Sequence, residues 1–134
     1  MSETNAPLPA KQTLLLILIP MLFTFAALRL YLHLVHVRHI YPGGYLVHHL
    51  FLGVVLALPA AFILAFGPRT RRSKLLAPVA LGIGSGMILD EFTYLVMTKA
   101  SDEDYVSRIS FLGAIVCISA AVVLLLLLYV THRD

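Results

Sequence analysis

Charged residues are scarce in this chain of 134 residues: they make up 13% of it, whereas 60% of the residues are hydrophobic. This balance excludes an ordinary soluble domain and indicates an integral membrane protein. A membrane-spanning helix needs about 20 apolar residues. We therefore expect about four such helices and no separate soluble domain.

Cysteine is almost absent, since Cys117 is the only one, and a single thiol excludes a disulfide within the chain. The sequence also lacks the His-Glu-x-x-His and Cys-x-x-Cys metal motifs, a phosphate-binding glycine loop and any nucleic-acid signature. The net charge of +3 is explained by membrane topology and anionic lipid headgroups, so no nucleic-acid partner is expected.

Four long apolar runs predict an all-α fold, a four-helix up-down bundle that spans the membrane. They cover residues 13–37, 44–66, 75–98 and 109–131, and residues 1–12 form a polar tail. Each run is about twice the length of a transmembrane barrel strand and lacks alternation of polar and apolar residues, which argues against strands. The whole of residues 13–134 is predicted to be one domain.

Basic residues indicate the orientation, because cytoplasmic loops concentrate lysine and arginine. The connection after the second run holds Arg69, Arg71, Arg72 and Lys74. Placing it in the cytoplasm puts both termini there too, with six basic residues inside and three outside. Both termini are thus predicted to be cytoplasmic.

Ionisable residues interrupt three of the four runs, and such groups inside a membrane indicate a functional site. The third run holds Asp90 and Glu91, the second holds His48 and His49, and the first holds Arg29, His33 and His36. Arg29 and Asp90 fall at the same depth, roughly 10–13 Å below the outer helix ends. A structural ion pair between Arg29 and Asp90 is therefore expected.

The same residues predict a metal site in the outer half of the bundle, because imidazole nitrogens and carboxylate oxygens are ligands for zinc and similar divalent transition metals. The candidate ligands are His33, His49 and Glu91, completed or flanked by His36 and His48. Asp90 and Glu91 are the candidate catalytic carboxylates, and an arginine near a dication disfavours Asp90 as a ligand. The site would serve hydrolysis of a lipid-linked substrate or the handling of ions.

Two other functions stay open. Paired histidines on facing helices could ligate a haem in an electron carrier. Alternatively, the polar groups fix helix register in a non-catalytic subunit or assembly factor. Its small-residue helix faces, such as that of Gly82 and Gly86, would pack within the bundle, against a second copy or against a larger membrane complex.

A helix that opens with His48-His49, followed by a glycine-rich helix with Asp90-Glu91, is similar to integral membrane proteins of bacteria and archaea. This likeness implies no activity. We expect the chain to lie in a prokaryotic inner membrane, with membrane lipids as partners.

Overall fold

The computed structural model describes residues 7–35, 48–99 and 101–131. This part of the chain is all-helical and contains no strand. The elements are α1 (Ala10–Leu34), α2 (His49–Phe66), α3 (Arg71–Met97), the short α4 (Asp102–Tyr105) and α5 (Arg108–Thr131). Four of them form the bundle, and α4 lies in the connection between α3 and α5.

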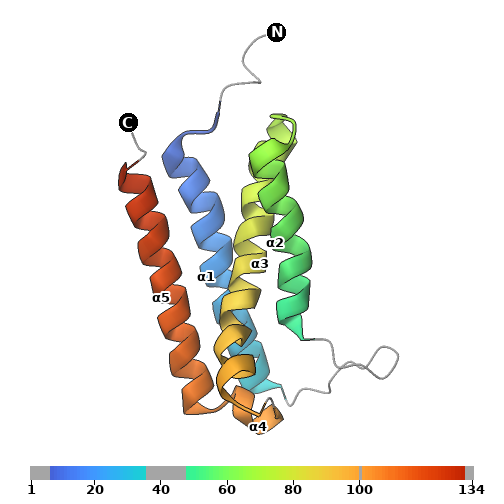
Figure 1. The fold of residues 1–134 in the computed structure, drawn as a ribbon, viewed down its shortest axis with the longest axis vertical. Coiled ribbons are helices and arrows are strands. Elements are labelled where there is room, and N and C mark those ends of the chain that lie inside the picture. The colour runs from blue at the N-terminus through green and yellow to red at the C-terminus, as the bar shows by residue number, and fades with distance from the viewer. Residues whose placement is uncertain (1–6, 36–47, 100, 132–134) are drawn as a thin grey trace, which may run out of the picture.

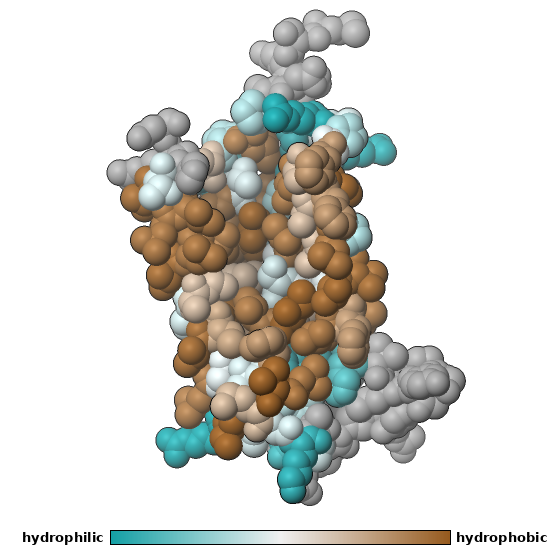
Figure 2. Space-filling model, in the orientation of Figure 1, coloured by the Kyte–Doolittle hydropathy of each residue, from teal (hydrophilic) through white to brown (hydrophobic). Residues whose placement is uncertain are grey.

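The four long helices alternate in direction (Figure 1). The start of α1, the end of α5 and the connection between α2 and α3 lie at one end of the bundle, and α4 lies at the other. Each long helix is apolar and long enough to cross a membrane. On the face in Figure 2, hydrophobic residues cover most of the bundle and hydrophilic residues gather towards its two ends. The chain is an integral membrane four-helix bundle.

Helix α3 is the central helix, because it packs against α1, α2 and α5, whereas α1 and α2 make no close backbone contact with each other. Glycine permits this close approach. A Cβ atom on Gly86 would lie 2.6 Å from the carbonyl oxygen of Met21 in α1, and one on Gly53 would lie 2.6 Å from the carbonyl oxygen of Gly84. The predicted small-residue face of Gly82 and Gly86 is thus used within the chain, against α1.

The small apolar core lies where α1 meets α5, around Met21, Phe25, Ala114 and Ile118. Many other large apolar side chains are exposed, among them Phe23, Phe62 and Leu127. In a bilayer these side chains face lipid, so packing inside the bundle depends on close helix contacts more than on a large core.

Several helix boundaries differ from the sequence prediction by a few residues: α1 begins at Ala10, before the predicted residue 13, α3 at Arg71, before residue 75, and α5 at Arg108, before residue 109. Helix α3 begins at Arg71 because the side chain of Thr70 accepts a hydrogen bond from the backbone N–H of Ser73, which caps the helix. Helix α1 ends at Leu34, where Val35 is extended, and the predicted end at residue 37 lies outside the described residues. The predicted start of the second helix at residue 44 lies outside the described residues.

Candidate functional site: a buried cluster of carboxylates and histidines

The site is built on Asp90 and Glu91, whose side chains are buried near the C-terminal end of α3. Asp90 is 0% exposed and Glu91 3%, and they lie about 10 Å from the end of the helix at Met97. Successive residues on a helix are turned by about 100°. Asp90 therefore contacts Arg29 of α1, whereas Glu91 contacts the start of α2.

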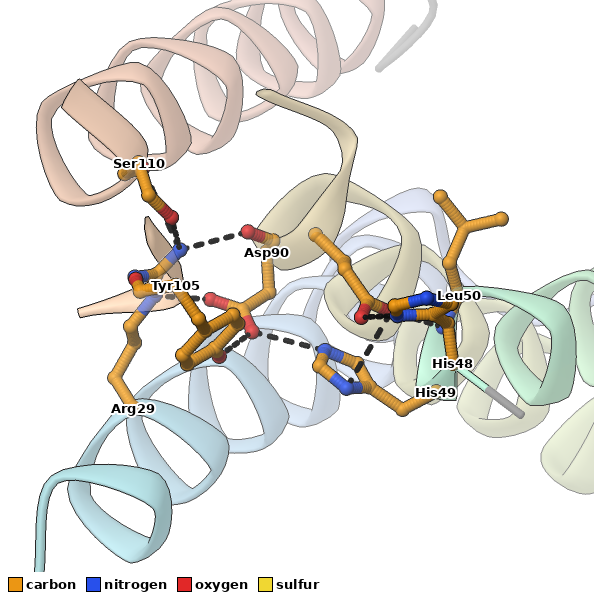
Figure 3. A network of polar contacts seen from close by, with 8 residues as sticks. Arg29, His48, His49, Leu50, Asp90, Tyr105 and Ser110 are labelled. Atoms are coloured by element: carbon orange, nitrogen blue, oxygen red, sulfur yellow. Dashed lines mark hydrogen bonds and ion pairs between the residues drawn. The ribbon is translucent and has the colours of Figure 1, made fainter. Parts of the chain in front are cut away.

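Arg29 holds Asp90 through both side chain and backbone (Figure 3). Its Nε donates to Oδ1 of Asp90, and its Nη2 donates to the carbonyl oxygen of the same residue at 2.8 Å. Other N–H groups of the guanidinium donate to the carbonyl oxygen of Tyr105 at 3.0 Å and to Oγ of Ser110 at 3.2 Å. The expected ion pair between Arg29 and Asp90 is present, and it also ties α1 to α4 and α5.

Tyr105 completes the surroundings of Asp90 from α4. Its hydroxyl group donates to Oδ2 of Asp90, and the guanidinium carbon of Arg29 lies 4.4 Å from the centroid of its ring, a favourable cation–π arrangement. Burial, followed by the Asp90 carboxylate, raises the pKa of Tyr105 above its usual range. The phenol therefore stays protonated and remains a hydrogen-bond donor.

His49 lies between the two carboxylates and uses both ring nitrogens. Its Nε2 is 3.0 Å from Oδ2 of Asp90, and its Nδ1 is 3.4 Å from Oε2 of Glu91. The ring also meets Tyr105 edge to face, with centroids 6.0 Å apart. His49 thus joins the Asp90 contacts to the Glu91 contacts.

Glu91 receives the beginning of α2. Nδ1 of His48 lies 2.6 Å from Oε1 of Glu91, and the backbone N–H of Leu50 donates to Oε2 at 2.7 Å. The first turn of a helix has backbone N–H groups without partners in the helix. The carboxylate satisfies one of these donors and lies at the positive end of the helix dipole, which stabilises its negative charge.

Together these contacts form one continuous cluster from Arg29 through Asp90, His49 and Glu91 to His48, which we call the carboxylate–histidine cluster. Within the described residues, every buried side-chain nitrogen and oxygen has a hydrogen-bond partner. Full satisfaction matters because an unpaired polar group in a low-dielectric interior is costly. The cluster therefore fixes the helices relative to one another at the end of the bundle where α4 lies.

The remaining residues that the sequence suggested as metal ligands do not join the carboxylate–histidine cluster within the described part of the chain. His33 is exposed and makes no hydrogen bond to either carboxylate, and His36 lies outside the described residues. Cys117 lies 3.5 Å from Oγ1 of Thr93. Over the parts of the chain that the structure describes, no three histidine, cysteine or acidic side chains are arranged to hold a metal ion.

Two members of the site escaped the sequence analysis. Tyr105 stands in the polar connection after α3, where helical periodicity gives no information about burial. The backbone N–H of Leu50 carries no side-chain signal at all. The spacing Ser101-x-x-Asp104 was a usable signal for α4, because each side chain accepts a hydrogen bond from the backbone of the other in a capping box.

No known family matches this chain. Curated proteins and solved structures likewise give no match. The function of the cluster has therefore to be inferred from its own contacts and charges.

Proposed function

We propose that this membrane protein binds a proton reversibly in the carboxylate–histidine cluster and uses it to control how α2 docks on α3. The contact that carries the proposal is His49 between two carboxylates, 3.0 Å from Asp90 and 3.4 Å from Glu91. From the sequence alone, the same residues predicted a metal site, for hydrolysis or the handling of ions, and proton binding was not among the expected functions.

The number of N–H groups on the imidazole of His49 decides whether it can donate to both carboxylates. A neutral imidazole has one N–H group, which can donate to only one of the two carboxylates. Its other nitrogen would then present a lone pair to the oxygen of the second carboxylate, which is repulsive. One additional proton on His49 makes both contacts favourable, because both ring nitrogens of an imidazolium are donors.

The charges of the cluster agree with this count. With His49 protonated, the cations Arg29 and His49 face the anions Asp90 and Glu91, and the buried group is neutral overall. Without that proton it carries one net negative charge, which is costly inside a membrane. Neutral His48 can still donate from Nδ1 to Glu91, so the additional proton is assigned to His49.

The consequence falls on α2, which packs against α3 alone among the described helices. At the outer end, α2 is held by His48, His49 and the N–H of Leu50. Loss of the proton from His49 removes one of these attachments. Proton binding therefore favours a closely docked α2, and its release favours a loosened one.

Proton counting on purified protein in nanodiscs tests the proposal. Over a full titration the wild type should exchange about one proton per chain more than His49→Gln. Nitrogen NMR of labelled histidine should show one imidazole with both nitrogens protonated, and His49→Gln should lose that signal. His33→Gln is the matched control, because His33 is exposed and outside the cluster, and it should keep the additional proton. Equal release by wild type and His49→Gln would refute the proposal.

A divalent metal remains a second candidate, because Nδ1 of both His48 and His49 lies against the Glu91 carboxylate. A zinc-like ion would take the place of the proton and would supply a Lewis acid for hydrolysis. Purified wild type would then carry close to one zinc per chain, and His49→Ala and Glu91→Ala would each lose most of it while staying folded. Protein that contains no metal and gains no thermal stability from zinc, manganese or iron would remove this candidate.

The chain is further proposed to lie in a prokaryotic inner membrane with both termini in the cytoplasm, on the strength of the basic first turn of α3. The cluster would then face the outer leaflet. A haem is less well supported, because both ring nitrogens of His49 lie against carboxylates, Nε2 at 3.0 Å from Asp90 and Nδ1 at 3.4 Å from Glu91. Association with a larger membrane complex remains open through the exposed apolar faces.

A further inference from the structure

A groove opens on the bundle surface where α1, α4 and α5 meet. Its volume is about 530 Å³, within the range of small-molecule sites. Its lining includes Arg29, His33 and Arg108 and no acidic residue. The charge of Arg29 is balanced by Asp90, so Arg108 supplies the positive charge that attracts an anion to the groove.

The remaining walls of the groove are apolar. Leu30 is 60% exposed, Val106 56% and Phe111 46%, and all three line the groove. Leu30 lies in the membrane-spanning helix α1, Val106 directly follows α4, and Phe111 lies in the first turn of α5. The groove thus places a basic side chain beside apolar ones at the end of a membrane bundle. This arrangement is complementary to an anionic lipid, whose charged headgroup adjoins its acyl chains.

We propose that this groove binds the phosphodiester headgroup of an anionic phospholipid. Arg108 is the main contact, because it is exposed and forms no ion pair within the described residues. Arg29 contributes less to headgroup binding, since its guanidinium already donates hydrogen bonds to Asp90, Tyr105 and Ser110. Its Nη1, however, has only one acceptor for two N–H groups, so one donor remains for the phosphate. This inference does not depend on the proton-binding function.

Another part of this chain is a poor occupant, because residues 36–47 contain Arg38 and two histidines but no acidic residue and so have the same sign of charge as the groove. A second copy could present the acidic residues of α4 (Asp102–Tyr105), and the oligomeric state in the experiment below distinguishes it from a lipid. A membrane lipid meets the charge requirement and also supplies acyl chains for the apolar walls.

Native mass spectrometry of detergent-solubilised protein with added phosphatidylglycerol or phosphatidylcholine tests the site. Wild type should retain phosphatidylglycerol in preference to the zwitterionic lipid. Arg108→Gln should lower that retention by roughly fivefold, the usual effect of one basic residue at an anionic membrane surface.

Lys99→Gln is the matched control, because it removes one positive charge from the same end of the bundle at an exposed residue outside the groove. It should leave lipid retention unchanged. Equal losses in Lys99→Gln and Arg108→Gln would mean general attraction to the surface and would overturn the proposal. Equal retention of both lipids, displacement of the lipid by millimolar inorganic phosphate, or an Arg108-dependent homodimer would also overturn it.

Discussion

Replacing Arg29 alone, the partner of the fully buried Asp90 carboxylate, should destabilise this bundle more than the loss of an intact ion pair would suggest, because it leaves a buried charge without its partner. Arg29→Met keeps the length of the side chain and deletes the charge, which leaves Asp90 at 0% exposure without its cation. Breaking a buried pair in this way usually costs about 3–5 kcal/mol. Asp90 keeps Tyr105 and His49 as donors, so we expect the lower end, about 3 kcal/mol.

The partner variant Asp90→Leu should cost a similar amount, because Arg29 then keeps only the oxygens of backbone groups and Ser110. The double variant Arg29→Met/Asp90→Leu has neither charge, so no buried charge is left without a partner. The double variant should therefore be more stable than the sum of the single losses predicts, with a coupling energy on the order of 2 kcal/mol. Reversible unfolding in mixed micelles, followed by circular dichroism, gives the free energies of all four proteins.

The neighbouring surface charges Lys99 and Asp104 provide the control cycle, and their coupling should be near zero because water screens exposed charges. Simple additivity at Arg29 and Asp90, equal to that of the surface pair, would refute the reasoning. It would mean that Arg29 reaches water or lipid headgroups when Asp90 is absent and that the buried pair contributes nothing of its own.

Two further predictions concern orientation and alkaline stability. In a Cys117→Ala background, a cysteine at Ser73 should be labelled only after permeabilisation and one at Ser101 in intact spheroplasts; the reverse pattern would invert the proposed topology. The raised pKa of Tyr105 means that its contribution to stability is complete below the usual tyrosine pKa of about 10 and declines above it, because only the unfolded chain then ionises. Tyr105→Phe should flatten this alkaline loss in pH-dependent unfolding, whereas the exposed control Tyr31→Phe should retain it, and an unchanged slope in Tyr105→Phe would contradict the assignment.

Composition and run length determined the membrane class and the number of long helices, because only a helix of about 20 apolar residues satisfies its own backbone in a bilayer. Depth along those helices was also readable, since rise per residue is constant. That is why Arg29 and Asp90 could be paired from the sequence. The spacing of four between His49, Gly53 and Ala57 in the sequence places His49, but not His48, on a small-residue face of its helix, and that face lies against α3.

Which groups touch depended on how the helices pack, and the sequence carries little information on that. The close approach of α2 to α3 at Gly53 brings both His48 and His49 to the carboxylates, whereas periodicity favoured His49 alone. The capped turn of α4 brings Tyr105 over Asp90 from a segment without a hydropathy signal. Helix periodicity fixes the direction of a side chain about its own axis, but the identity of its partner depends on distances between axes, which only the tertiary structure decided.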